Sequence, residues 1–104
     1  MISGVSEIYD AHARINSYIH NTPLIHSKEI NKLCGCDIVF KADNLQKIGA
    51  FKARGACNAI LSLEKTALDR GVITHSSGNH GAALSWAAQM KKSSCIVVMP
   101  ENAS

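Results

Sequence analysis

Two short stretches decide how this chain folds: Gly49-Ala50-Phe51-Lys52-Ala53-Arg54-Gly55-Ala56 and Ser76-Ser77-Gly78-Asn79-His80-Gly81. The first is a turn of small residues that carries one lysine and opens into a helix pattern. The second is a turn with hydroxyls, an amide and two glycines, and it also starts a helix pattern. Turns of this kind between strands and helices predict an α/β fold.

The segments around the two turns alternate between helix and strand. Apolar residues at helical spacing predict helices over residues 6–20, 27–33, 51–64 and 79–90. Continuous apolar runs predict buried strands over residues 37–41, 72–74 and 95–99. Ser6 and Ser27 are expected to begin the first two helices, and Gly35 to end the second. Strands that are apolar on both faces and alternate with helices indicate a parallel sheet covered on both sides.

The bulk composition excludes several classes of protein. The chain has 104 residues, of which 46% are hydrophobic and 18% charged, so it can form a core and is not of disordered composition. Its net charge of +3 comes from scattered basic residues, which argues against nucleic-acid binding. No apolar run approaches the roughly 20 residues that span a bilayer, and no secretion signal is present. We therefore expect a cytoplasmic protein that binds neither nucleic acid nor membrane.

The four cysteines do not form a recognisable metal site. Cys34 and Cys36 are one residue apart, a closer spacing than in the usual zinc pairs, and no second pair completes a site. Reduced structural thiols are the favoured interpretation, and a metal or redox role is the alternative. Cys57 and Cys95 fall on apolar faces and are predicted to be small core residues.

The lysine turn has two interpretations. Lys52 stands at the start of an apolar helix pattern, where burial would disfavour the charged form of its amine and leave it able to condense with a carbonyl. Phe51 offers a flat face to a heteroaromatic ring. From spacing alone, however, a solvated lysine at a helix N-terminus is the favoured interpretation of Lys52.

The second turn is equally open on its residues alone. A helix N-terminus presents unpaired N–H groups and a positive dipole end, which suit a carboxylate or phosphate. Gly78 and Gly81 allow close approach of the backbone to a ligand. The same residue types also serve as ordinary helix caps, which is the favoured interpretation on these residues alone. A module that binds an anion through this turn alone is a further alternative, but it leaves the lysine turn unexplained.

The two turns together resemble those of a known enzyme family. The run Lys41-Ala42-Asp43-Asn44-Leu45-Gln46, the lysine turn and Ser-Ser-Gly-Asn-His-Gly are similar to motifs of the pyridoxal-phosphate (PLP)-dependent serine racemases and serine/threonine dehydratases. Thr22-Pro23-Leu24 and residues 96–103 extend the resemblance over nearly the whole chain, and it is strongest to the eukaryotic serine racemases. Ile48 and Ala50 depart from the family pattern, which often has a small hydroxyl residue or glycine at the first position and serine at the second.

The resemblance implies PLP as cofactor and a small amino acid as substrate. Lys52 would form the internal aldimine and move protons on one face of the substrate Cα, and Ser77 would be the acid/base on the opposite face. Phe51 and Asn79 would contact the cofactor. The substrate carboxylate would be bound by Ser76, Ser77, Gly78, Asn79 and His80. Arg54 is expected to support structure. Racemisation and dehydration, and serine and threonine, all remain open.

The resemblance also implies an incomplete three-layer parallel-sheet fold of the tryptophan synthase β-like type. Residues 1–70 would begin the large PLP domain, and residues 71–104 the small domain. The family's phosphate loop and its carboxylate-ligated divalent metal site would lie further along, so we expect this chain to be the N-terminal part of a longer, homodimeric enzyme. A truncated, non-catalytic product that does not retain PLP is the alternative.

Overall fold

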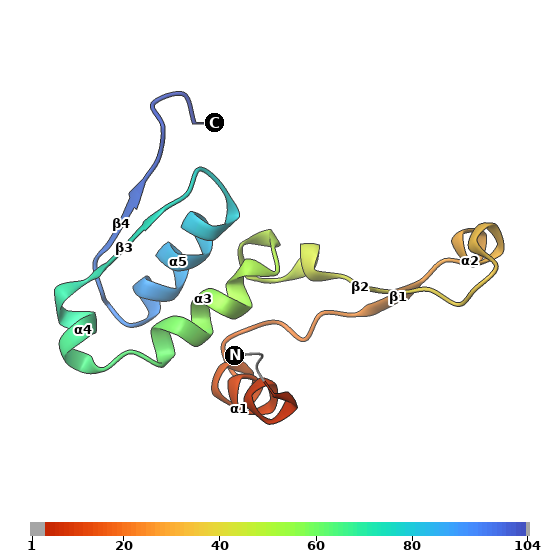
Figure 1. Ribbon diagram of the computed structural model, residues 1–104, viewed down its shortest axis with the longest axis horizontal. Coiled ribbons are helices and arrows are strands. Elements are labelled where there is room, and N and C mark those ends of the chain that lie inside the picture. The colour runs from red at the N-terminus through yellow and green to blue at the C-terminus, as the bar shows by residue number, and fades with distance from the viewer. Residues whose placement is uncertain (1–3, 104) are drawn as a thin grey trace.

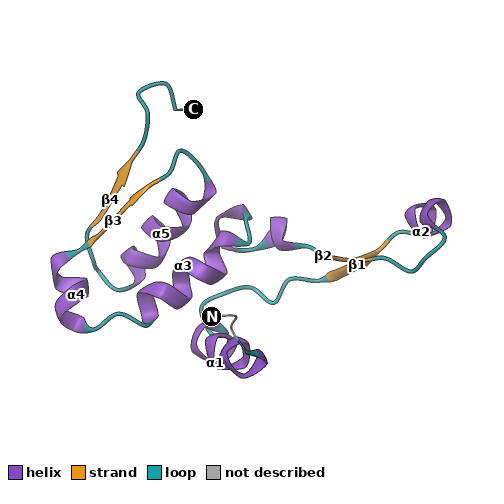
Figure 2. Ribbon diagram, in the orientation of Figure 1, coloured by secondary structure: helices purple, strands orange, loops and turns teal. Residues whose placement is uncertain are grey.

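The computed structural model describes residues 4–103, which form a body of helices and strands with a projecting arm (Figure 1). The arm consists of residues 24–41, and its two strands and one helix extend away from the body. The chain measures 52 × 39 × 28 Å and has a radius of gyration of 16.7 Å, against about 13 Å for a compact domain of this length. The arm accounts for this elongated shape. Figure 2 distinguishes the helices and strands, whose bounds in chain order are α1 (Val5–Ile15), β1 (Leu24–His26), α2 (Lys28–Cys34), β2 (Val39–Lys41), η1 (Asp43–Leu45), η2 (Lys47–Gly49), α3 (Lys52–Leu61), α4 (Lys65–Arg70), β3 (Val72–His75), α5 (Asn79–Met90) and β4 (Cys95–Val98).

The core of the body lies where α3 packs against α5. The buried residues on both helices are mostly alanines, which let the two helices approach closely. Ile60 is 1% exposed and supplies the largest fully buried side chain of this core. Cys57 is completely buried, as predicted, and Cys95 packs against the core from β4.

The parallel strands β3 and β4 pair in register from Val72 opposite Cys95 to His75 opposite Val98. Alternate residues point to opposite faces of this pair. Val72, Cys95 and Val97 lie on the half-buried face, which α5 covers. The other face is exposed in the described chain, and its apolar side chains are Ile73, Ile96 and Val98.

The prediction for residues 37–41 was wrong in two respects. The strand there, β2, pairs antiparallel with β1, so it does not join β3 and β4 in one sheet. It is also exposed: Phe40 is 41% and Val39 is 47% accessible. β1 and β2 are alone together in the arm, and a two-stranded ribbon cannot bury both of its faces.

The remaining elements follow the predicted pattern with different bounds. α1 begins after Gly4 instead of Ser6 and ends at Ile15, so the expected helix to residue 20 is too long. α3 is shorter than expected at its C-terminal end, and α4 was not predicted. α2 begins and ends as expected: the Ser27 hydroxyl accepts a hydrogen bond from the backbone N–H of Ile30, and Gly35 adopts the left-handed conformation with φ +66°.

Candidate active site

Lys52 is the first residue of α3, and a strained loop leads into it. In this loop Ile48 has φ +58° and Gly49 has φ +71°, so two successive residues are left-handed. The left-handed region is unfavourable for a β-branched residue such as isoleucine. The Ile48 side chain packs against the α3–α5 core, and this contact compensates for the strain. The position at which the family resemblance breaks is therefore an apolar anchor of the lysine loop.

Arg54 lies on the first turn of α3 and forms a two-pronged ion pair with Asp43. Its Nε and one terminal nitrogen each donate to a different oxygen of Asp43, both at 2.8 Å. The same terminal nitrogen lies 3.2 Å from the Thr22 hydroxyl, which donates to Asp43 at 2.6 Å. The Arg54 hydrogen bond, against the opposing effect of burial, lowers the pKa of Asp43 to about 2. The predicted structural role of Arg54 is confirmed by these contacts.

The Ser-Ser-Gly-Asn-His-Gly turn links the end of β3 to the start of α5. The backbone N–H of Gly78 donates to the Ser76 hydroxyl over 3.2 Å, and α5 then begins at Asn79. Gly81 sits where the helix crosses β4: a Cβ atom there would lie 2.9 Å from Cγ1 of Val97 and 3.3 Å from the carbonyl oxygen of Ser76. Glycine is required at this position because α5 packs so closely on the sheet.

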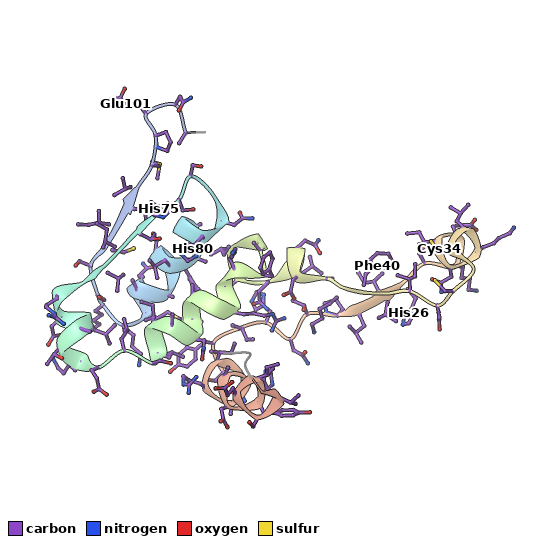
Figure 3. The ribbon with its side chains drawn as sticks, viewed as in Figure 1. His26, Cys34, Phe40, His75, His80 and Glu101 are labelled. Atoms are coloured by element: carbon purple, nitrogen blue, oxygen red, sulfur yellow. The ribbon has the colours of Figure 1, made fainter. Side chains whose placement is uncertain are left out.

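The two turns meet at one pocket of about 360 Å³. Phe51 and Lys52 line it from the α3 side, and His80 and Leu84 from α5. The N-terminal ends of α3 and α5 thus lie at the same end of the helix pair (Figure 1). His26, Cys34 and Phe40 lie on the arm, well away from His75 and His80 (Figure 3).

The hydroxyl residues of the second turn line a different pocket. Ser76, Ser77 and Gly78 border a hollow of about 460 Å³ beside β4. Of the residues predicted to bind substrate, the structure therefore brings His80 to the lysine and places the two serines in the separate hollow beside β4. Asn79, the first residue of α5, joins the two groups along the chain.

The residues at the first pocket fit an aldehyde cofactor with an aromatic ring. The Lys52 amine lies 5.3 Å from the centroid of the Phe51 ring, so an amine able to condense with a carbonyl stands beside a flat apolar face. The N-terminus of α5 adds backbone N–H donors suited to an anion. Lys52 is exposed, however, so the burial expected from the sequence is absent. The physical reason is that α3 and α5 alone form the walls of the pocket among residues 4–103.

Sequence reasoning identified the two turns but missed how the lysine turn is held. Gln46 is 3% exposed, and its side-chain amide pairs with both the N–H and the carbonyl of His20, each over 2.8 Å. The motifs that contain Thr22 and Asp43 do not reveal that these two side chains contact each other. The available signal for these contacts was the polar character of Thr22 and Asp43 next to apolar residues, since buried polar groups need hydrogen-bond partners.

The described residues offer neither a metal centre nor a membrane span. Within residues 4–103, no three or more His, Cys, Asp or Glu side chains gather where a metal ion could bind. Among the helices of the same region, none is long and apolar enough to cross a membrane.

Comparisons with known proteins define the class. The family model described as "Pyridoxal-phosphate dependent enzyme" matches residues 15–104. The serine racemase of Dictyostelium discoideum is 54% identical over 95% of this chain and 31% of its own length, and its crystal structure superposes with a TM-score of 0.91. The β-hydroxyaspartate dehydratase of Paracoccus denitrificans is 47% identical over 89% of this chain and 30% of its own. A crystal structure of threonine deaminase from T.th., 41% identical, covers 96% of this chain and 32% of its own, with a TM-score of 0.86.

The fold and the family match together show an α/β protein of the PLP-dependent fold type II class. The chain belongs to the pyridoxal-phosphate-dependent enzyme family, among whose members serine racemases, hydroxyaspartate dehydratases and threonine deaminases are similar to it. It spans about a third of the length of these relatives. The boundary expected between residues 70 and 71 stays a prediction.

Proposed function

We propose that the whole protein is a PLP-dependent enzyme that racemises serine, or removes water from serine or threonine, at this site. Three relatives with these related activities support the reaction class. The observation that carries the proposal is the shared pocket, in which Lys52 and His80 come from two helices that begin at the same end of the body.

PLP, when bound, withdraws electrons from the substrate Cα and so acidifies its C–H bond. Lys52 would hold the cofactor through its amine and, when free of it, take or return the Cα proton on one face. Phe51 would lie along the cofactor ring, and Asn79 would form a hydrogen bond with the hydroxyl oxygen on that ring. The turn Ser76–His80 would orient the substrate through its carboxylate, which suits the N–H groups at the start of α5.

Ser77 would act on the face of Cα opposite Lys52. A racemase needs one group on each face, because the proton must leave from one side and return on the other. A dehydratase needs proton removal on one face and loss of the β-hydroxyl. Ser77 is exposed in the hollow beside β4, and it is the residue that would separate the two outcomes.

The test is to incubate the whole protein with PLP and then with L-serine or L-threonine in D₂O. We expect either D-serine that carries deuterium at Cα, or the corresponding 2-oxo acid that carries deuterium at Cβ, because elimination turns Cα into a carbonyl carbon. After borohydride reduction, mass spectrometry should find the cofactor on Lys52. Lys52→Ala should abolish both results, whereas Lys32→Ala, which alters an exposed lysine on α2, should change neither. Cofactor fixed at another lysine would contradict the proposal.

We also propose that residues 1–104 alone do not retain PLP, because this piece spans about a third of its relatives. Titration of the purified piece with PLP tests this, and saturable uptake would contradict it. The proposed setting of the whole protein is a cytoplasmic homodimer. A divalent metal is proposed only for residues beyond this chain.

A further inference from the structure

We infer that Arg54, held by Asp43 and Thr22, is a positioning residue that fixes the start of α3 and with it the amine of Lys52. The inference rests on the proposed function for its catalytic consequence. Its structural part, an ordered lysine loop, stands on this chain's own contacts. Arg54 follows Lys52 by two residues, so both side chains come from the first turn of α3.

The network joins three segments that are far apart in sequence. Thr22 lies between α1 and β1, Asp43 is the first residue of η1, and Arg54 lies on α3. All three side chains contact one another at 2.6 to 3.2 Å. Lys41 adds a fourth residue to the network, since its Nζ donates to the Thr22 carbonyl over 2.7 Å. The arm and the body are therefore joined at a point close to Lys52.

We call the Thr22–Asp43–Arg54 network the first clamp of the lysine loop. A second clamp holds the other end of this loop. Gln46 binds His20 through two hydrogen bonds, and its Oε1 also accepts from the backbone N–H of Lys47 over 2.9 Å. Between the two clamps lie the left-handed residues Ile48 and Gly49. A strained conformation persists only where its surroundings enforce it. The two clamps, with the packing of Ile48, provide that enforcement.

The chemistry of the ion pair suits positioning. A guanidinium bound to a carboxylate through two parallel hydrogen bonds is fixed in direction, whereas a lysine ammonium is a point charge on a flexible stem. The side chains of Arg54 and Asp43 are 28% and 19% exposed, so solvent screens the pair only in part. The low pKa of Asp43 keeps its carboxylate ionised at neutral pH. Arg54 also borders the pocket of Lys52.

The chain supplies a matched control for the ion pair. Lys65 and Asp69 on α4 form a second salt bridge, at 2.7 Å, but both side chains are largely exposed, at 86% and 62%. Exposed pairs of this kind contribute little to stability. Asp69→Asn therefore removes a carboxylate partner without touching the lysine loop.

The first experiment measures hydrogen–deuterium exchange in the whole protein without cofactor. Loss of a hydrogen bond to a charged group should speed exchange of the peptide 44–53 by about tenfold or more in Asp43→Asn. Asp69→Asn should leave this peptide unchanged. Thr22→Val should speed exchange less than Asp43→Asn does, and Thr22→Ser, which keeps the hydroxyl, should exchange at the wild-type rate. This pair of variants decides the question if Asp43→Asn does not fold. Unchanged exchange in folded Asp43→Asn or Thr22→Val would overturn the inference.

The second experiment adds PLP and measures orientation and turnover. Arg54→Lys keeps the positive charge and loses the two parallel hydrogen bonds to Asp43. The bound cofactor should then be held less rigidly, so its circular dichroism per unit of absorbance should fall. We expect kcat to drop about 10- to 100-fold with KM changed far less, as for a misplaced reacting group. Unaltered dichroism and kcat would overturn the positioning role. If wild-type protein takes up no PLP, the proposed function fails, and the exchange experiment still decides on the clamp.

Discussion

Lys52 and His80 lie 28 positions apart in the sequence, yet they line the same pocket at the start of two packed helices. The packing of α3 on α5 produces this relationship, because alanines at the contact bring the two helix axes close. Each helix then contributes its first turn to the pocket. An amine and the N-terminus of a helix, which favours anions, thereby face a common space.

Ser77→Ala should separate the two proposed reactions. Without the Ser77 hydroxyl, the face of Cα opposite Lys52 has no proposed proton donor, so conversion of L-serine to D-serine should fall by about 10²- to 10⁴-fold, the usual contribution of a general acid or base. Elimination from the L-substrate uses the Lys52 face and should change far less. Chiral chromatography of the amino acid, with an assay of the 2-oxo acid, measures both rates.

The adjacent Ser76 is the matched control for this experiment. Its hydroxyl accepts from the N–H of Gly78, so Ser76→Ala should loosen the turn and weaken substrate binding. Its expected signature is a raised KM in both reactions, with no selectivity between them. Equal losses of racemisation and elimination in Ser77→Ala would remove the opposite-face role of Ser77.

Gly81→Ala should destabilise the protein by about 1–3 kcal/mol, as expected for overpacking at a close contact. The added methyl would stand 2.9 Å from Val97 and 3.3 Å from the Ser76 carbonyl oxygen, and the backbone atom cannot easily move. Urea unfolding followed by circular dichroism measures the change. Gly55→Ala on α3 is the control: a Cβ there meets no neighbouring atom within 4 Å, and alanine favours a helix, so we expect stabilisation by about 0.5–1 kcal/mol.

The sequence predicted the body of this fold better than the arm. α5, β3 and β4 are long or apolar enough for periodicity to reveal them, and their helix–strand alternation indicated the parallel pair. β1 has only three residues after Pro23, and α4 has only two apolar residues in six, so neither gives a periodic signal. β2 was misplaced because the apolar character of Val39 and Phe40 indicates burial without specifying against which partner.

The site shows the same division. The motifs located Lys52 and the Ser-Ser-Gly-Asn-His-Gly turn, since glycines, hydroxyls and a lone lysine in a small-residue turn are visible in a sequence. The two clamps depend on contacts between distant residues: Thr22 with Asp43, and Gln46 with His20, are each more than 20 positions apart. No local pattern encodes those contacts, and only the fold reveals them.

Acid should destabilise the protein through Asp43 at low pH. The folded-state pKa of about 2 lies below the ordinary value of 3.8, so the ionised carboxylate stabilises the fold above pH 4. This contribution, about 2 kcal/mol from the size of the shift, should be lost as the pH falls from 4 to 2. Urea unfolding at pH 7, 4 and 2.5 measures it. Asp43→Asn should be less stable at pH 7 and should lose less on acidification; parallel curves for the two proteins would contradict this role.

Residues 1–104 expressed alone should self-associate through the open face of the β3–β4 pair. Ile73, Ile96 and Val98 are between 53% and 68% exposed there, and within residues 4–103 the outer edge of each of the two strands is unpaired. Apolar sheet surfaces with free edges favour pairing with other chains. Light scattering should therefore show concentration-dependent oligomers, and Ile73→Lys with Ile96→Lys should reduce them because two like charges would then face each other across each contact. Ile8→Lys, on exposed α1, is the control. If it suppresses association as well as the strand variants do, general apolar exposure drives the process and this face has no special part in it.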